Sequence, residues 1–279
     1  MPDADTTIAR HYARPAMLES IRAAVRAAGG DPDRPALDDL APYDEFHLGG
    51  REATLTLVDR LRDVARPGAL VLDVGCGLGG PARVLADATG CDVLGVDLTP
   101  EFVEAGTALT RAVGLGDRVR LVHADATALP LDDASVDAAW QIHVGMNIPD
   151  KGAVAREVHR VLRPGGRYVV FDVMGDGNHV LRFPVPWASG PSLSAVEPPE
   201  AYRRHLEGAG LRVVGQHDRR EIAQRFLAAM RERRARGEPL PMRTDVFIGP
   251  EAGERFANLG EAVQAGRVAP VEMVAVRPA

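Results

Sequence analysis

Three carboxylates stand at the ends of apolar runs in the first half of the chain. Asp73, Asp97 and Asp125 each follow a stretch rich in Val, Leu and Ala, and the glycine-rich stretch Gly75–Gly80 comes directly after the first acid. A carboxylate accepts hydrogen bonds from hydroxyl and amino groups and attracts cations. A glycine turn at the start of a helix presents free backbone N–H groups. These residues together indicate a binding site for a nucleotide-like ligand.

The glycine stretch has the pattern of a strand, a tight turn and a helix. Gly75, Gly77 and Gly80 satisfy the G-x-G-x-x-G spacing of dinucleotide-binding proteins, which is a weak signal alone. Asp73 stands two residues before the first glycine, where it would repel a pyrophosphate, and Gly79 adds a further glycine. S-adenosylmethionine has no phosphate, and it carries a cationic ammonium and a sulfonium. The stretch therefore favours S-adenosylmethionine over NAD as the cofactor.

The next two acids are expected to bind the adenosine part of that cofactor. Asp97, followed by Leu98, is placed to accept hydrogen bonds from the ribose hydroxyls. Asp125 is placed to accept from the adenine amino group, while the backbone N–H of Ala126 donates to the ring. The alternatives are a helix N-cap for Asp97 and a loop-stabilising role for Asp125.

With these motifs the chain resembles a class I S-adenosylmethionine-dependent methyltransferase. The segments that carry the resemblance are Leu72–Gly80, Gly95–Leu98, Asp125–Pro130, Ser135–Ala139 and Arg160–Gly166. It implies an α/β, Rossmann-like sheet with strand order 3-2-1-4-5-7-6, an antiparallel last strand, and helical N-terminal and lid additions. It also implies that the first acid and the glycine loop hold the methionine end, and that a fourth-strand amide lies near it or near the acceptor. The residues concerned are Asp73, Gly75, Cys76, Gly77, Gly79 and Gln141.

A looser resemblance links three stretches to the bacterial branch of sarcosine/dimethylglycine N-methyltransferases and related small-molecule enzymes. These stretches are His143–Lys151, Phe183–Ala188 and Asp44–His47. The same branch contains quinone and secondary-metabolite methyltransferases. The resemblance therefore implies a small-molecule acceptor, either a small amine or a secondary metabolite, and leaves nitrogen, oxygen and carbon open as the methylated atom.

From residue 69 onward, apolar runs and helical patterns alternate, which predicts a parallel sheet with helices on both faces. Strands are expected at 69–74, 92–97, 118–123, 136–143, 167–173, 211–217 and 268–277. Helices are expected at 6–28, 51–65, 79–89, 100–113, 150–162, 199–209, 219–236 and 250–266, with a polar linker reaching about 42 and a turn at 163–166. The expected parts are an N-terminal helical cap and linker (1–50), a cofactor-binding core (51–174), and an acceptor lid with the remaining strands and a helical insertion (175–279).

Catalysis of methyl transfer needs alignment first, and a base only where the acceptor must lose a proton. His143 is the first candidate base, because it follows the fourth strand at the edge where the methyl group should point. A hydrogen-bonded structural histidine is an equal alternative. His47 and Tyr12 are further candidates for acceptor contact, since their segments are expected to fold over the cofactor. The histidines are scattered without paired spacing, so no metal site is expected.

The proline-rich stretch 175–199 is expected to form part of the lid. Phe183, Trp187 and Met146 are expected to line an apolar acceptor pocket. An acidic acceptor would instead require an arginine clamp, for which Arg182 is available.

Composition narrows the class of protein. The chain has 279 residues with a net charge of −6, which indicates no general attraction to nucleic acid or acidic membranes. Two cysteines and an N-terminus without signal-peptide features fit a cytoplasmic protein. An apolar N-terminal helix on a linker could pack on a second copy. An NAD-dependent oxidoreductase and a protein that binds S-adenosylmethionine without transferring its methyl group are the rival functions.

Overall fold

The sheet has the expected strand order. The computed structural model describes residues 16–178, 181–238, 240, 242–243, 248 and 251–279. Within them, seven strands pair in the order β3-β2-β1-β4-β5-β7-β6, with β7 antiparallel to both of its neighbours. The strands are β1 (Leu70–Val74), β2 (Asp92–Asp97), β3 (Val119–His123), β4 (Val136–Ile142), β5 (Leu162–Gly175), β6 (Arg212–Asp218) and β7 (Val268–Val276).

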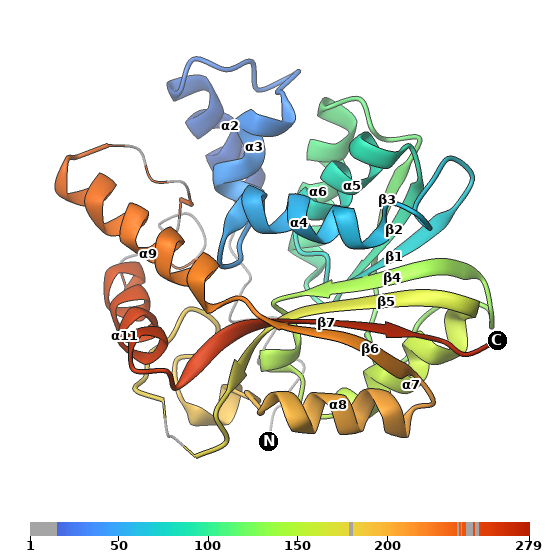
Figure 1. Cartoon of the computed structure of the whole chain (residues 1–279). Helices are drawn as coiled ribbons and strands as arrows, with labels where there is room; N and C mark the ends of the chain where they lie inside the picture. Colours follow the sequence, from blue (N-terminus) through green and yellow to red (C-terminus); the bar gives the residue numbers. More distant parts are fainter. Residues whose placement is uncertain (1–15, 179–180, 239, 241, 244–247, 249–250) are drawn as a thin grey trace.

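Helices cover both faces of this sheet (Figure 1). On one face lie α4 (Gly50–Leu61), α5 (Gly80–Thr89) and α6 (Pro100–Ala112), and on the other lie α7 (Lys151–Val161) and α8 (Pro199–Gly208). Parallel strands buried on both sides read as continuous apolar runs, as β1 does. Leu72 and Val74 join the core on the α7 side, whereas Val71 joins the core on the α5 side.

Two local expectations were wrong. The segment expected to be a polar linker contains the helix α3 (Leu37–Asp44), which continues through Pro42. Leu40 and Tyr43 of this helix are buried, so tertiary packing outweighs its polar composition. The turn expected at 163–166 lies inside β5 as an irregularity, because the pairing with β4 passes from Leu162 directly to Arg167.

The N-terminal cap is built from α2 (Met17–Ala27) and α3. It lies on the side of the sheet that α4, α5 and α6 cover (Figure 1). Met17, Ile21 and Val25 form the buried stripe of α2, and they pack in one cluster with Leu109 of α6. The apolar stripe that suggested contact with a second copy is therefore used within the chain itself.

Two helices follow β6 and precede β7, as expected for an insertion between the last two strands. They are α9 (Arg220–Ala235) and α11 (Ala252–Gln264), and Figure 1 shows them beyond one end of the sheet. Their apolar residues pack in one cluster with Trp187 and Met146. Among the described helices, none is long and apolar enough to cross a membrane.

A buried ion pair ties the cap to the glycine loop. The guanidinium of Arg83, on α5, is fully buried, and its Nη2 donates to Asp44 Oδ2 at 2.6 Å. Its Nη1 donates to the Leu78 carbonyl at 2.8 Å and to Thr110 Oγ1 at 2.9 Å. The arginine thus joins α3, the loop and α6 at one point. Burial raises the pKa of Asp44, and the charge of Arg83 opposes this shift.

Removal of this arginine should destabilise the whole fold. We expect Arg83→Met to lower the free energy of unfolding by about 3–5 kcal/mol, because Asp44 then stays buried without its partner. Arg62→Met is the matched control, since that side chain is 57% exposed in its pair with Asp59 and should cost at most about 1 kcal/mol. Urea unfolding of both variants measures the difference. Similar losses in the two variants would contradict a structural role for the buried pair.

Candidate active site

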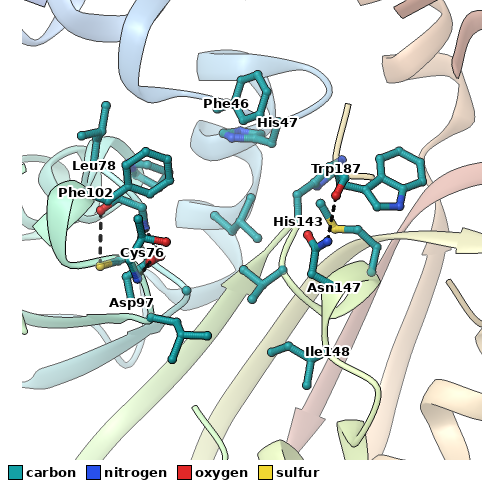
Figure 2. A pocket seen from close by; sticks show the side chains of 18 of the residues that line it. Phe46, His47, Cys76, Leu78, Asp97, Phe102, His143, Asn147, Ile148 and Trp187 are labelled. Carbon is teal, nitrogen blue, oxygen red and sulfur yellow. Dashed lines mark hydrogen bonds between the residues drawn. The ribbon is translucent and has the colours of Figure 1, made fainter. Parts of the chain in front are cut away.

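One cavity opens at the carboxyl ends of the central strands. It encloses an empty volume of about 1540 Å³, part of which is open to solvent. Figure 2 shows two sides that face each other, one with Cys76, Asp97 and Phe102, the other with His143, Asn147 and Trp187. In parallel sheets of this kind, ligands bind at this edge. The two sides differ in the chemistry of their side chains.

The glycine loop is held against the end of β2. The backbone N–H groups of Gly75 and Cys76 both donate to the Val96 carbonyl, at 2.8 and 2.9 Å. Gly77 donates its N–H to Asp97 Oδ2 at 2.8 Å. Gly75 and Gly77 have φ values of 70° and 53°, which a residue with a side chain rarely adopts. This loop therefore presents bare backbone to the cavity.

Gly75, Cys76 and Gly77 line the cavity, whereas Gly79 does not. A Cβ on Gly77 would meet nothing within 4 Å, so the backbone there borders open space. A Cβ on Gly79 would lie 2.9 Å from Leu121 Cδ1. Gly79 thus allows the loop to pack closely on β3, and it does not line the cavity where a ligand contact was predicted.

The three acids predicted from the sequence all line this cavity, together with Leu98 and Ala126. Asp73 is only 2% exposed, and its Oδ2 has no hydrogen-bond partner. Burial raises the pKa of Asp73 to about 7, the nearby indole of Trp140 opposes this shift, and the charge of Asp97 adds to it. A buried carboxylate oxygen without a partner is costly, so this position fits a cationic or hydrogen-bonding ligand group.

The other two acids also stabilise their own turns. Asp97 accepts from the Thr99 amide at 2.8 Å through Oδ1, in addition to the bond from Gly77. Asp125 accepts from the Thr127 amide at 2.7 Å. The loop-stabilising alternative therefore applies to Asp125, and it is compatible with ligand binding because a carboxylate has about four acceptor positions.

The opposite side of the cavity is apolar. Trp187 and Met146 line it as expected, whereas Phe183 packs in the same cluster without lining the cavity. Trp187 is fixed by a hydrogen bond from its Nε1 to Ser194 Oγ at 3.0 Å, and its carbonyl accepts from Asn147 at 2.9 Å. Further apolar residues of this lining were not predicted from the sequence; they are Phe46, Leu48, Met242, Phe256 and Leu259.

His47 lies between α3 and α4, and Figure 2 shows its ring projecting between the two sides of the cavity. Its Nε2 lies 3.1 Å from the Gly50 carbonyl oxygen and 3.2 Å from Thr54 Oγ1. No described residue forms a hydrogen bond with its Nδ1. Burial lowers the pKa of His47 to about 4, so its imidazole is neutral at pH 7.

His143 is nearby but differently placed. The two imidazole centroids are 5.9 Å apart. The Leu48 amide donates to Nε2 of His143 at 3.4 Å, and Nδ1 is buried without a partner among the described residues. Burial also lowers the pKa of His143 well below its usual value. Both ring nitrogens are thus covered by protein, which favours the structural alternative over the role of a base.

Gln141 is not brought together with the other predicted residues. Its Nε2 donates to Asp172 Oδ2 at 3.0 Å, and its Oε1 accepts from the Tyr168 hydroxyl at 2.8 Å. Successive residues of a strand point to opposite faces. Ile142 reaches the cavity, so Gln141 joins a buried polar network on the other face instead. This position does not support a contact with the methionine part of a cofactor.

Two further predictions have different outcomes. Tyr12 lies outside the described residues. Arg182 is 67% exposed and lies 3.7 Å from Glu261, away from the cavity lining. It is therefore not placed as a clamp for an acidic acceptor. Within the part of the chain that the structure describes, no group of three or more His, Cys, Asp or Glu side chains could hold a metal ion.

The groups on the acidic side of the cavity fit S-adenosylmethionine better than a phosphate-bearing cofactor. Asp73 offers an unpartnered carboxylate oxygen, Gly77 borders open space, and Asp97 and Asp125 add two more acids. No lysine or arginine is among the described lining residues. Such a surface repels phosphate and attracts an ammonium or a sulfonium.

Comparison with known proteins identifies the domain. Residues 72–170 match the methyltransferase-domain family. The chain is 42% identical over 146 residues to the methyltransferase GfsG of Streptomyces halstedii. The matched stretch covers 52% of this chain and 50% of that protein. It is 34% identical over 180 residues to a 27-O-demethylrifamycin SV methyltransferase of Amycolatopsis mediterranei, which covers 61% of this chain and 64% of that protein. The chain thus matches about half to two thirds of the length of these relatives.

Solved structures share the fold. A geranyl diphosphate C-methyltransferase from Streptomyces coelicolor superposes with a TM-score of 0.69 at 21% identity, covering 99% of this chain and 98% of that one. A protein from Galdieria sulphuraria, described as a sarcosine dimethylglycine methyltransferase, gives a TM-score of 0.66 at 22% identity, covering 81% and 85%. The domain match and the sheet order support the resemblance found in the sequence: residues 72–170 match a methyltransferase domain, and the sheet has the strand order of the class I S-adenosylmethionine-dependent methyltransferases.

Proposed function

We propose that the protein transfers the methyl group of S-adenosylmethionine to an uncharged, largely apolar small molecule. The observation that carries this proposal is the two-sided cavity, with acids on one side and aromatic and aliphatic side chains on the other. The domain match supports the cofactor and the reaction class. We assign the methionine end to Asp73 and the glycine loop, the ribose to Asp97, and the adenine to Asp125.

The bound cofactor supplies a methyl group on a positively charged sulfur, which is already activated for displacement. A lone pair of the acceptor forms a bond to the methyl carbon while the carbon–sulfur bond breaks, and S-adenosylhomocysteine leaves. The protein contributes alignment, which is worth roughly 7–11 kcal/mol in well-oriented reactions. An acceptor hydroxyl must also lose its proton, and we assign the proton acceptor to His47 because its imidazole is neutral and projects into the cavity.

The electrostatics of the cavity argue against an anionic acceptor. Its described lining residues include four aspartates and no lysine or arginine. A carboxylate or diphosphate group would find no described cation there and would be repelled by the acids. An uncharged acceptor instead gains about 25 cal/mol for each Å² of apolar surface that it buries. The lid residues Trp187, Met242 and Phe256 fit such a molecule.

The rival functions are less well supported. An NAD-dependent oxidoreductase does not fit the domain match or the acid that precedes the glycine loop. A protein that binds S-adenosylmethionine without turnover keeps the same cofactor side, so only product formation separates it from a methyltransferase. We also propose that the protein is a cytoplasmic small-molecule enzyme, because its two cysteines fit a reducing compartment. Its net charge of −6 favours neither nucleic-acid nor membrane partners.

The direct test of the reaction is S-adenosylhomocysteine release with acceptors of two classes. We expect release with hydroxylated apolar probes, namely alkylphenols, quinols and sterols, and none with sarcosine or dimethylglycine. Release with the amino acids alone would contradict the uncharged acceptor. Cofactor binding without release for any probe would contradict methyl transfer and favour the binding-only alternative.

A pair of variants locates the acceptor in the lid. We expect Met242→Ala to raise KM for the productive phenol or sterol and to leave the affinity for S-adenosylmethionine unchanged, because Met242 lines the apolar side. Val214→Ala is the matched control, since Val214 is 48% exposed on β6. Steady-state kinetics measure both effects. An unchanged KM in the lid variant would contradict this placement of the acceptor.

Cofactor affinity should depend on pH through Asp73. The carboxyl group must ionise to pair with an ammonium, and burial raises its pKa to about 7 in the free protein. The dissociation constant of S-adenosylmethionine should therefore rise as pH falls below 7, by about tenfold per unit at most. Above pH 8 this dissociation constant should no longer change through Asp73. Fluorescence or calorimetric titration measures this profile.

The matched variant for that titration is Asp73→Asn. It should bind the cofactor more weakly at pH 8 and lose the pH dependence between about 5.5 and 8.5, which lie about one and a half pH units on either side of the pKa of Asp73. An identical pH profile in Asp73→Asn and the parent would contradict the assignment of the ammonium site to Asp73.

A further inference from the structure

A chain of hydrogen bonds runs from a buried carboxylate to the imidazole in the cavity. Thr54, on α4, donates its hydroxyl to Glu45 Oε2 at 2.5 Å. The same hydroxyl oxygen lies 3.2 Å from Nε2 of His47. All three side chains are buried, with Glu45 2% exposed and Thr54 fully covered. The sequence gives no signal for this chain, because Thr54 lies in an ordinary helical stretch.

The hydrogen-bond partners of His47 determine which of its two ring nitrogens carries the proton. The Gly50 carbonyl, 3.1 Å from Nε2, can only accept a hydrogen bond. The Thr54 hydroxyl donates its single hydrogen to Glu45, so toward Nε2 its oxygen can only accept, like the Gly50 carbonyl. Nε2 of His47 therefore carries the proton, and Nδ1 keeps a lone pair with no described partner.

The carboxylate of Glu45 is itself held in place. Arg51 donates from Nε to Glu45 Oε1 at 2.6 Å, so both oxygens of Glu45 have partners. Burial raises the pKa of Glu45, and the bonds from Thr54 and Arg51 oppose this. Glu45 Oε2 lies 3.7 Å from Nε2 of His47, close enough to stabilise a positive imidazolium.

We propose that Thr54 and Glu45 are positioning residues, which keep the Nδ1 lone pair of His47 available to take the proton of the methyl acceptor. The proposal rests on the proposed methyl transfer. As the acceptor oxygen bonds to the methyl carbon, its proton moves to Nδ1, and the new imidazolium keeps its Nε2–H bonded to Thr54 and Gly50. Glu45 balances the positive charge through Thr54. His143 cannot take this role, since both of its ring nitrogens are covered.

Other charged groups near His47 act in the same or the opposite direction. The charge of Asp44 raises the pKa of His47, whereas the charge of Arg51 lowers it, and burial is the largest effect. His143 on the sheet side is neutral, because burial lowers its pKa well below 6.5. Thr54 carries no charge itself, but its hydroxyl lowers the pKa of Glu45, so its replacement tests the hydrogen bond together with the charge that this bond stabilises on Glu45.

The test compares Thr54→Val with Thr54→Ser in the full chain. Valine keeps the shape and loses the hydroxyl, whereas serine keeps the hydroxyl. With an acceptor that gives turnover, we expect Thr54→Val to lower kcat about tenfold or more, since a positioned base contributes roughly 10²–10⁴-fold. Thr54→Ser should restore kcat to within about threefold of the parent, well inside that range. The dissociation constant of S-adenosylmethionine should stay unchanged in both.

Nitrogen-15 NMR of the imidazole gives a readout that needs no turnover. In the parent, His47 should show a protonated Nε2 and an unprotonated Nδ1. In Thr54→Val the fraction of His47 with the proton on Nε2 should fall, because only the Gly50 carbonyl still accepts from that nitrogen. His47→Gln, as the reference, identifies the resonance. A parent with the proton on Nδ1, or a Thr54→Val variant with the kcat and pH profile of the parent, would overturn the proposal.

The outcomes separate this proposal from the proposed function. Absence of S-adenosylhomocysteine release by the parent would remove the function, whereas the tautomer would still test the hydrogen-bond chain. Release by the parent, with equal kcat in Thr54→Val, would leave the function standing and remove the positioning role. A fall in kcat that Thr54→Ser does not restore would also overturn it, because simple packing damage then explains the loss.

Discussion

The attachment of the glycine loop to the end of β2 is the constraint on which the site depends. Gly75 and Cys76 share the Val96 carbonyl, and Gly77 bonds to Asp97. These bonds need backbone angles that side chains disfavour, which explains glycine on both sides of Cys76. They also place the Asp73 carboxylate and the Asp97 carboxylate on one cavity wall. A ligand that reaches the loop therefore meets both acids at once.

The opposite wall combines residues that directly follow β4 with segments distant in sequence. The turn after α3 brings His47, the segment after β5 brings Trp187, and α11 brings Phe256. The buried Asp44–Arg83 pair anchors the first of these segments to α5. In the proposed function, the cofactor and the acceptor are bound by walls of different origin, so the acceptor wall can change while the cofactor wall stays the same.

The sheet and the acidic wall of the cavity, with Asp73, Asp97 and Asp125, could be predicted from the sequence because both follow local patterns. Strand β2 was expected at the bounds it has, 92–97, and all three acids reach the cavity. Gln141 could not be placed, because a strand buried on both faces shows no alternation that reveals which side a residue takes. His143 was favoured for its position after β4, but the Leu48 amide that covers it comes from a distant turn. The helix α3 was missed because its stability comes from packing on α2 and α5.

We infer that acids at the ends of successive strands bind the cofactor, whereas the lid binds the acceptor. Calorimetric titration of S-adenosylmethionine into Asp97→Ala and Leu259→Ala tests it most directly. Loss of hydrogen bonds to a charged group costs about 1.5–3 kcal/mol, so Asp97→Ala should bind about 10–100-fold more weakly, and Leu259→Ala should bind as the parent does. Equal affinity in Asp97→Ala and the parent, with both folded, would contradict the assignment of the cofactor to these acids.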